Sequence, residues 1–240
     1  DRSERGQEIV SQLQNISQRR DIIESPVKDN EITQVIRQRL FTRIDQPKAE
    51  AMVSHFLEYA IKESILPSGV EPSEYRKRFE QSYPFMPEVV DILYTRWGTF
   101  TNFQRTRGVL RLLSMVVHSL KNTALPYISL ADFDLNDQHI RQELLRHTGS
   151  EYNGIIASDL TSNDAGAKKI DNSLGDSHKG LKLGSRTATT IFMHSFSGGQ
   201  EKGTNLGDIK RIATTTQNHA AVVAEAVEQL KGRLFYLQYQ

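Results

Sequence analysis

The sequence predicts a mainly α fold in two units: a helical unit at residues 1–125, and a second helical unit with few short strands at residues 126–240. The first observation is that apolar residues recur three and four positions apart along most of the chain, which places them on one side of a helix. The second is that segments rich in proline and glycine separate these stretches. The third is a change in composition after Pro126, so we place the boundary between residues 123 and 130.

The first unit is expected to contain six helices. They lie at residues 4–18, 31–41, 47–65 and 73–82, at a segment that starts at Pro87, and at residues 103–120. Pro87 suits the first position of a helix, where its missing N–H costs no hydrogen bond. Asn102 is a typical N-cap residue for the last and most apolar of these helices. Side chains expected in the core of this unit include Ala51, Phe56, Trp97, Leu112 and Val116.

The second unit is expected to begin with a helix that Asn136 caps. Residues 158–185 are rich in Ser, Asn, Asp, Gly and Lys, so we expect a mobile surface loop with one helical turn there. Three helices follow at residues 186–195, 206–213 and 220–231, and "RLFYLQY" at 233–239 is expected to be a strand. Three short helices before a strand are the order of a winged helix-turn-helix, so we expect a winged-helix-like module.

The composition is that of a globular protein and excludes several classes of function. The net charge of +1 provides no overall basic field for nucleic acid, so any DNA contact needs a local patch. The absence of cysteine excludes disulfides and thiolate zinc sites, and it fits a reducing compartment. No apolar stretch is long enough to cross a bilayer, and the first residues lack the apolar core of a signal peptide. We therefore expect a cytoplasmic protein without a membrane partner.

Residues 197–200 read S-G-G-Q, the letters of the signature loop in ABC-type ATPases. Such a loop presents backbone N–H groups to a phosphate, but it completes a site only opposite a Walker A loop. The pattern G-x-x-x-x-G-K-[ST] is absent from this sequence. We therefore interpret the glycines as a turn between two helices, because glycine readily adopts positive φ.

Four residues after the expected boundary have the spacing of a calcium-binding EF-hand loop. Asp132, Asp134, Asn136 and Glu143 fall at its first, third, fifth and twelfth positions. The sixth position should be glycine and is Asp137, so we interpret this segment as a helix start with a favourably placed acid. The histidines show no metal-binding spacing either, and we expect no metal site.

Three arginines, Arg105, Arg107 and Arg111, crowd the start of the helix expected at 103–120. Arg107 and Arg111 are four residues apart and share one helix face. Cations near a helix N-terminus oppose the helix dipole, so an anion should compensate them. The anion is either a carboxylate such as Glu88 or Asp91, or a phosphate, which the planar guanidinium binds well. From chemistry alone the carboxylates are favoured.

Four long blocks occur in order: "EITQVIRQRLF", "SYPFMPEVVDILYTRWGTFTNFQRTRGVLRLL", "DLNDQHIRQELLRHTGSEY" and "RTATTIFMHSFSGG". They resemble consecutive blocks of a family of large prokaryotic P-loop ATPases of the AAA+ type, often found in phage-defence and DNA-modification gene islands. The resemblance covers most of residues 25–240. A block that usually reads F-H-P-E in that family is Phe85-Met86-Pro87-Glu88 here, so any role of that histidine is lost.

The resemblance implies that the nucleotide core, with Walker A, Walker B and sensor 1, lies before residue 1. This chain then resembles the helical lid followed by a winged-helix-like module. ATP and Mg²⁺ would be ligands of that core, and none is expected for this chain alone. In AAA+ lids an arginine, often three residues after a glycine, reaches the γ-phosphate, and Gly108-Val-Leu-Arg111 matches that spacing. The resemblance therefore makes Arg111 the first nucleotide contact, Arg107 the second, and Arg105 an intersubunit contact.

The sequence offers only weak grounds for DNA binding. The helix at 220–231 carries Glu225 and Glu228 against Lys231, and acids there would be repelled by phosphates. Lysines in the 158–185 segment would provide weak, salt-sensitive contacts; they are Lys168, Lys169, Lys179 and Lys182.

The expected function is that of a nucleotide-sensing lid and regulatory part of an ATPase. Without Walker A and B motifs the chain alone should not hydrolyse ATP. Its expected partner is the N-terminal ATPase core, with self-association and weak DNA contact as further options. The alternative is a non-enzymatic helical adaptor that binds DNA or protein. The two differ in whether Arg107 and Arg111 are free or paired with Glu88 and Asp91.

Overall fold

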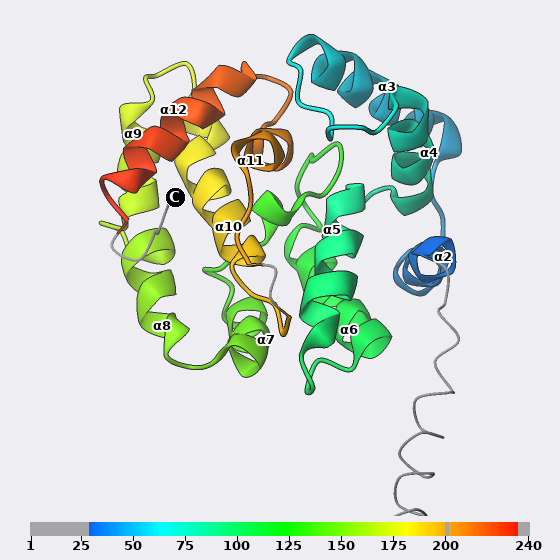
Figure 1. The fold of residues 1–240 in the computed structure, drawn as a ribbon, viewed down its shortest axis with the longest axis horizontal. Coiled ribbons are helices and arrows are strands. Elements are labelled where there is room, and N and C mark those ends of the chain that lie inside the picture. The colour runs from blue at the N-terminus through cyan, green and yellow to red at the C-terminus, as the bar shows by residue number, and fades with distance from the viewer. Residues whose placement is uncertain (1–28, 200–201, 235–240) are drawn as a thin grey trace, which may run out of the picture.

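The computed structural model describes residues 29–199 and 202–234, which form helices and loops without a strand (Figure 1). The prediction of a mainly α protein is confirmed. The α-helices are α2 (Asp29–Leu40), α3 (Gln46–Lys62), α4 (Pro72–Ser82), α5 (Pro87–Asp91), α6 (Arg105–Ser119), α7 (Gln138–Thr148), α8 (Tyr152–Ile155), α9 (Gly166–Ser173), α10 (Leu183–His194), α11 (Leu206–Ala213) and α12 (Ala220–Lys231). Shorter π and 3₁₀ segments are η1 (Ile92–Arg96), η2 (Trp97–Thr99), η3 (Leu130–Asp132), η4 (Ile156–Thr161) and η5 (Lys179–Leu181).

One hydrophobic core connects the two groups of helices. In Figure 1, α2 to α6 lie on one side and α8 to α12 on the other, with α7 below and between them. The buried apolar side chains form a continuous cluster that extends from Ile32 in α2 to Leu230 in α12. The core therefore runs across the boundary expected at residues 123–130.

Aromatic packing holds the connection between the two groups in place. Tyr127 packs edge-on against Phe56 of α3 and Phe79 of α4, with ring centroids 5.3 and 5.7 Å away. Phe56 and Phe79 in turn contact each other at 5.5 Å. Such edge-to-face pairs add to the gain from burying the rings. The segment after α6 is thus anchored on α3 and α4.

The segment that starts at Pro87 begins as predicted and then changes its helix type. Pro87 is in the first turn of α5, which continues as η1 and η2. Trp97 is fully buried, and its indole Nε1 donates to the carbonyl of Met193 at 3.1 Å. Arg96 donates to the carbonyls of His194 and Gly203. The end of this segment therefore binds the end of α10.

Two helix caps differ from the prediction. The helix α6 starts at Arg105, and Gln104 occupies its cap position with a left-handed backbone. Asn102 does not cap it, because the Asn102 amide donates to the carbonyl of Arg146 at 3.1 Å. Asp137 rather than Asn136 caps α7, and its carboxylate accepts from the N–H of His139 and Ile140.

The packing of α3 differs at one predicted core position. Ala51 is exposed, while Val53 and Leu57 are buried with the predicted Phe56. The buried side of α3 is thus shifted around the helix.

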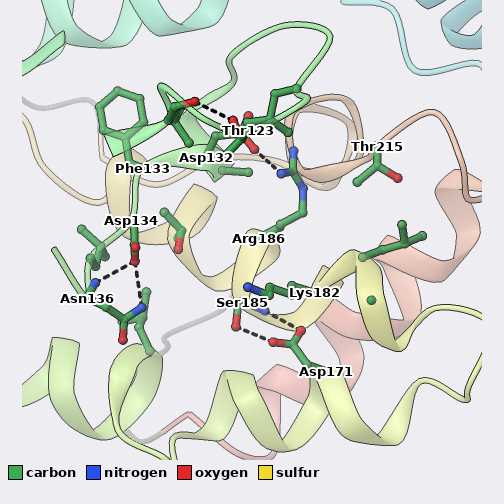
Figure 2. A pocket seen from close by; sticks show the side chains of 18 of the residues that line it. Thr123, Asp132, Phe133, Asp134, Asn136, Asp171, Lys182, Ser185, Arg186 and Thr215 are labelled. Carbon is green, nitrogen blue, oxygen red and sulfur yellow. Dashed lines mark hydrogen bonds and ion pairs between the residues drawn. The ribbon is translucent and has the colours of Figure 1, made fainter. Parts of the chain in front are cut away.

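The segment 158–185, predicted as a loop, contains α9 and η5. Ala167 and Ile170 of α9 are fully buried. A Cβ at Gly184 of α10 would lie 2.6 Å from the carbonyl oxygen of Ala167, so the glycine allows the two helices to touch. The carboxylate of Asp171 accepts from the N–H of Ser185 at 3.0 Å, which Figure 2 shows. Small residues in this segment therefore allow α9 and α10 to pack closely against each other.

The last three helices lie close to their predicted positions. Helices α11 and α12 have the predicted bounds, and α10 begins at Leu183, three residues early. The helix expected at 4–18 and the strand expected at 233–239, except for its first two residues, lie outside the described residues. Among the described helices, none has the length and apolar character needed to cross a bilayer.

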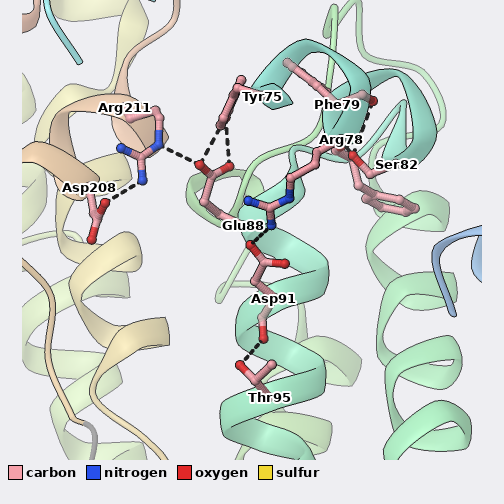
Figure 3. Close-up of polar contacts among 10 residues, drawn as sticks. Tyr75, Arg78, Phe79, Ser82, Glu88, Asp91, Thr95, Asp208 and Arg211 are labelled. Carbon is pink, nitrogen blue, oxygen red and sulfur yellow. Dashed lines mark hydrogen bonds and ion pairs between the residues drawn. The ribbon is translucent and has the colours of Figure 1, made fainter. Parts of the chain in front are cut away.

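A buried guanidinium joins the two sides of the molecule (Figure 3). Arg211 of α11 donates from Nε to Glu88 of α5 at 2.6 Å and from a terminal nitrogen to the carbonyl of Ile65 at 3.1 Å. It also binds Asp208. Tyr75 of α4 donates its hydroxyl to Glu88 at 3.0 Å. Four segments distant in sequence meet in this network.

Burial and charge act in opposite directions on the pKa of Arg211. Burial is the largest single effect and would lower it, but Glu88, Tyr75 and Asp208 together outweigh burial and raise it, so the guanidinium stays charged. Burial, with the nearby Glu88, raises the pKa of Tyr75 well above its ordinary value, so the phenol stays neutral and keeps its proton to donate. Arg211 and Tyr75, the two titratable donors of the network, therefore keep their protons at neutral pH.

We predict that Glu88→Gln lowers the free energy of unfolding by about 3 kcal/mol, because it leaves a buried guanidinium with reduced charge compensation. The matched control is Asp91→Asn, which breaks the 2.5 Å contact of Asp91 with Arg78 on side chains that are 44% and 38% exposed. That variant should lose at most about 1 kcal/mol. Urea unfolding measures both values, and equal losses would show that the buried pair has no special role.

Candidate functional site

The three predicted arginines lie together at the solvent-exposed start of α6. Arg105 sits over the Tyr94 ring, with its Cζ 6.0 Å from the ring centroid. Arg107 is exposed and forms no side-chain hydrogen bond or ion pair within residues 29–199 and 202–234. Arg111 forms an ion pair with Glu143 at 3.0 Å, yet its side chain is 49% exposed. The site thus presents one unpaired and one half-exposed guanidinium.

The carboxylate partner of Arg111 is not one of the two that were expected. Glu88 is paired with Arg211, and Asp91 is paired with Arg78. The partner is instead Glu143 of α7, a helix that packs against α6. Arg111 therefore pairs with a carboxylate, as the chemistry of the sequence predicted, but the carboxylate belongs to Glu143 and not to Glu88 or Asp91.

Glu143 is the buried centre of this cluster. Its side chain is 4% exposed and faces three basic groups: Arg111 at 3.0 Å, Arg146 at 3.3 Å and His147 at 3.3 Å. The other ring nitrogen of His147 lies 3.1 Å from the amide oxygen of Asn102. A buried carboxylate that contacts two guanidinium groups and an imidazole fixes the geometry of the α6 start.

The start of α6 also has an electrostatic preference for anions. Its first turn contains no acidic residue, and the cap residue Gln104 makes no side-chain hydrogen bond to it. The helix dipole therefore adds to the positive charge of the arginines. Packing alone explains why residue 108 is glycine, because a Cβ there would lie 1.9 Å from the carbonyl oxygen of Phe103.

The S-G-G-Q segment is a structural turn in its described residues, 197–199. The N–H of Gly198 donates to the Thr99 hydroxyl at 2.8 Å, and the N–H of Gly199 donates to the Ser197 hydroxyl at 3.0 Å. A Cβ at Gly198 would lie 2.7 Å from the Thr99 carbonyl oxygen. Both N–H groups are occupied, so they are not presented to a phosphate.

The EF-hand spacing does not assemble a metal site. Asp132 accepts from the N–H of Ser129 at 2.7 Å and pairs with Arg186. Asp134 accepts from Asn136 at 2.9 Å. Within the described part of the chain, no three His, Asp or Glu side chains are placed to hold a metal ion.

A cleft of about 850 Å³ lies at the opposite end of α6 (Figure 2). Its walls come from the end of α6, the loop from Thr123 to Asn136, the segment from α9 to the start of α10, and residues 214–217. The lining contains four basic residues and three acidic ones; they are Lys168, Lys179, Lys182, Arg186, Asp132, Asp134 and Asp171. Sequence reasoning did not find this cleft.

Arg186 connects several of the segments that line the cleft. Its guanidinium pairs with Asp132, donates from Nε to the carbonyl of Ala213 at 2.8 Å, and donates to the Ser129 hydroxyl at 3.2 Å. Only 12% of its side chain is exposed. The signal in the sequence was a lone charge in "RTATTIF", because a charged residue inside an otherwise uncharged helix usually requires a partner.

Burial lowers the pKa of His147, and the neighbouring Glu143 only partly offsets this effect. Burial also lowers the pKa of His194. A histidine whose folded pKa is depressed contributes stability above its unfolded pKa, and that stability is lost as the pH falls toward the folded pKa.

We therefore predict that the free energy of unfolding decreases as the pH falls below about 6.5. In His147→Gln this decrease should be smaller, because one of the two depressed groups is gone. Urea unfolding over a series of pH values measures the slope. A slope that is the same in the variant would contradict the role assigned to His147.

Comparison with known proteins gives a family but no characterised relative. A protein-family model described as the DUF499 second domain matches residues 27–229. No curated protein and no solved structure matches significantly.

Proposed function

The chain belongs to the family of DUF499 second domains, and from this premise we propose that it is a nucleotide-sensing lid and regulatory domain of an AAA+-type P-loop ATPase. In this proposal another part of the parent protein supplies the Walker motifs and holds ATP and Mg²⁺. The four sequence blocks that resemble such ATPases support the proposal, as does the helical architecture. The domain itself would supply arginines to the bound phosphates.

The observation that carries the proposal is the arrangement of arginines at the start of α6. Arg107 is exposed without a side-chain partner among the described residues, and Arg111 is half-exposed on the same helix face. Their charges stand at the positive end of the helix dipole, an unfavourable position unless an anion joins them. A phosphate group fits both guanidinium geometry and the helix end.

The proposed mechanism is electrostatic. A guanidinium that reaches the γ-phosphate stabilises the charge that spreads over its oxygens during transfer. Arg111 has a second partner, the buried Glu143, so its guanidinium would be shared between Glu143 and phosphate. Loss of the phosphate would return Arg111 to Glu143 alone, which couples the state of the nucleotide to the contact between α6 and α7.

One observation favours the alternative of a helical adaptor without a nucleotide contact. The Arg111–Glu143 pair already neutralises Arg111 within the domain. For such an adaptor a protein partner is better supported than DNA, because Glu225 and Glu228 are exposed on α12. The two proposals differ in what Arg107 does.

The test uses the longer parent protein with Arg107→Ala and Arg111→Ala. We expect each variant to reduce ATP turnover at least about ten-fold, equivalent to about 1.4 kcal/mol of barrier. The matched control is Arg146→Ala, because Arg146 also pairs with Glu143 and is 55% exposed. That control should retain turnover near the wild-type value.

Three readouts decide between the proposals. Circular dichroism and urea unfolding establish that each variant is folded. Unchanged turnover and ATP affinity in folded Arg107→Ala and Arg111→Ala would exclude the lid proposal and leave the adaptor. Equal losses in Arg146→Ala would show that disturbance of Glu143, and not a phosphate contact, causes the defect.

A further inference from the structure

We propose that the cleft between the end of α6 and the start of α10 binds a small phosphorylated molecule, such as a nucleoside monophosphate or a sugar phosphate. This site is separate from the arginines discussed above. Its lining includes Ser119 and Leu120, at the end of α6, whereas Arg107 lies in the first turn of that helix. An α-helix rises 1.5 Å per residue, so about 20 Å separates the two places.

The acids of the cleft all have hydrogen-bond or ion-pair partners within the protein. Asp132 pairs with Arg186 and accepts from Ser129, and Asp134 accepts from Asn136. Asp171 accepts from the N–H and the hydroxyl of Ser185, at 3.0 and 2.5 Å. Each acid therefore has hydrogen-bond donors inside the domain, and none of them needs a bound cation.

The lysines of the cleft, in contrast, have few direct partners within the described residues. Lys179 and Lys182 are exposed, and neither forms a side-chain hydrogen bond or ion pair with a residue that the structure describes. Lys168 donates only to a backbone carbonyl, that of Thr161. The cleft thus has one more basic than acidic side chain in its lining. On the wall formed by α9, η5 and the start of α10, Lys179 and Lys182 have no direct ion-pair partner among the described residues, although Lys182 also stabilises the charge of Asp171. Lysine ammonium groups of this kind bind phosphate as point charges.

Other lining residues are polar and uncharged. They include Gln217, and Thr123 and Thr215, whose hydroxyls donate to the carbonyl of Leu120 and the amide oxygen of Asn218 and can still accept a hydrogen bond. Tyr127 also lines the cleft, and its buried hydroxyl has no hydrogen-bond partner among the described residues. Burial raises the pKa of this phenol, and the nearby charge of Arg186 only partly offsets that effect, so the hydroxyl keeps its proton.

The size of the cleft agrees with this class of ligand. A volume of about 850 Å³ lies in the range of pockets that bind small molecules, about 300–1,000 Å³. A lining that combines lysines with hydroxyl and amide groups matches a molecule with a phosphate and a polar body. A bare anion would leave most of the cleft empty.

The test is isothermal titration calorimetry of this domain with AMP, glucose 6-phosphate and pyrophosphate, and with adenosine and glucose as unphosphorylated controls. We expect saturable binding of at least one phosphorylated probe and none of the controls. The double variant Lys179→Gln/Lys182→Gln should weaken that binding at least about ten-fold. The matched control is Lys169→Gln, because Lys169 is an exposed lysine of α9 outside the cleft lining.

Several outcomes would overturn the proposal. They are the absence of binding by all three phosphorylated probes at millimolar concentration, equal weakening in Lys169→Gln, and unchanged affinity in the folded double variant. Arg107→Gln separates this site from the proposed lid contact. If that variant abolishes binding while the double variant does not, the phosphate is bound at α6 and the cleft assignment is wrong.

Discussion

The buried guanidinium of Arg211 is the constraint on which the arrangement of the helices depends. A charge cannot leave water unless hydrogen bonds and an opposite charge replace its hydration. Here the hydration is replaced by Glu88, Asp208 and the carbonyl of Ile65. Tyr75 donates a further hydrogen bond to the Glu88 carboxylate. These groups belong to separate segments, so α4, α5, α11 and the loop after α3 must come together in one arrangement.

Two further buried charges act in the same way at other contacts between helices. Arg186 ties α10 to η3 and to the segment after α11 through Asp132 and backbone carbonyls. Glu143 ties α7 to α6 through Arg111. Charges that the fold uses are therefore buried and have several partners. Arg107 at one end of α6, and Lys179 and Lys182 near the other, are among the exposed charges of the described residues that have no side-chain partner, and the two proposals assign ligands to them.

Most of the longer helices were predictable from the sequence, and their contacts were not. The spacing of apolar residues located α11 and α12 and placed Val109, Leu112 and Val116 in the core. That spacing is a local signal, because each helix repeats every 3.6 residues. The Glu88–Arg211 pair joins residues 123 positions apart, and no local pattern marks such a partner.

The candidate sites show the same limit. The exposed arginines of α6 could be recognised from their position at a helix start, but the carboxylate that holds Arg111 could not, since Glu143 comes from another helix. The segment 158–185 was misjudged because glycine and serine indicate loops by composition. In the structure these small residues let α9 pack on α10, as at Gly184, and this packing forms one wall of the cleft.

The most direct test is a structure of the longer parent protein with Mg²⁺ and a slowly hydrolysed ATP analogue. The central claim is that Arg107 and Arg111, which remain exposed at the start of α6 in the folded domain, contact the nucleotide. The account predicts that the guanidinium of Arg107 or Arg111 lies within hydrogen-bond distance of the γ-phosphate. A bound nucleotide with the start of α6 facing solvent or another protein surface would contradict it.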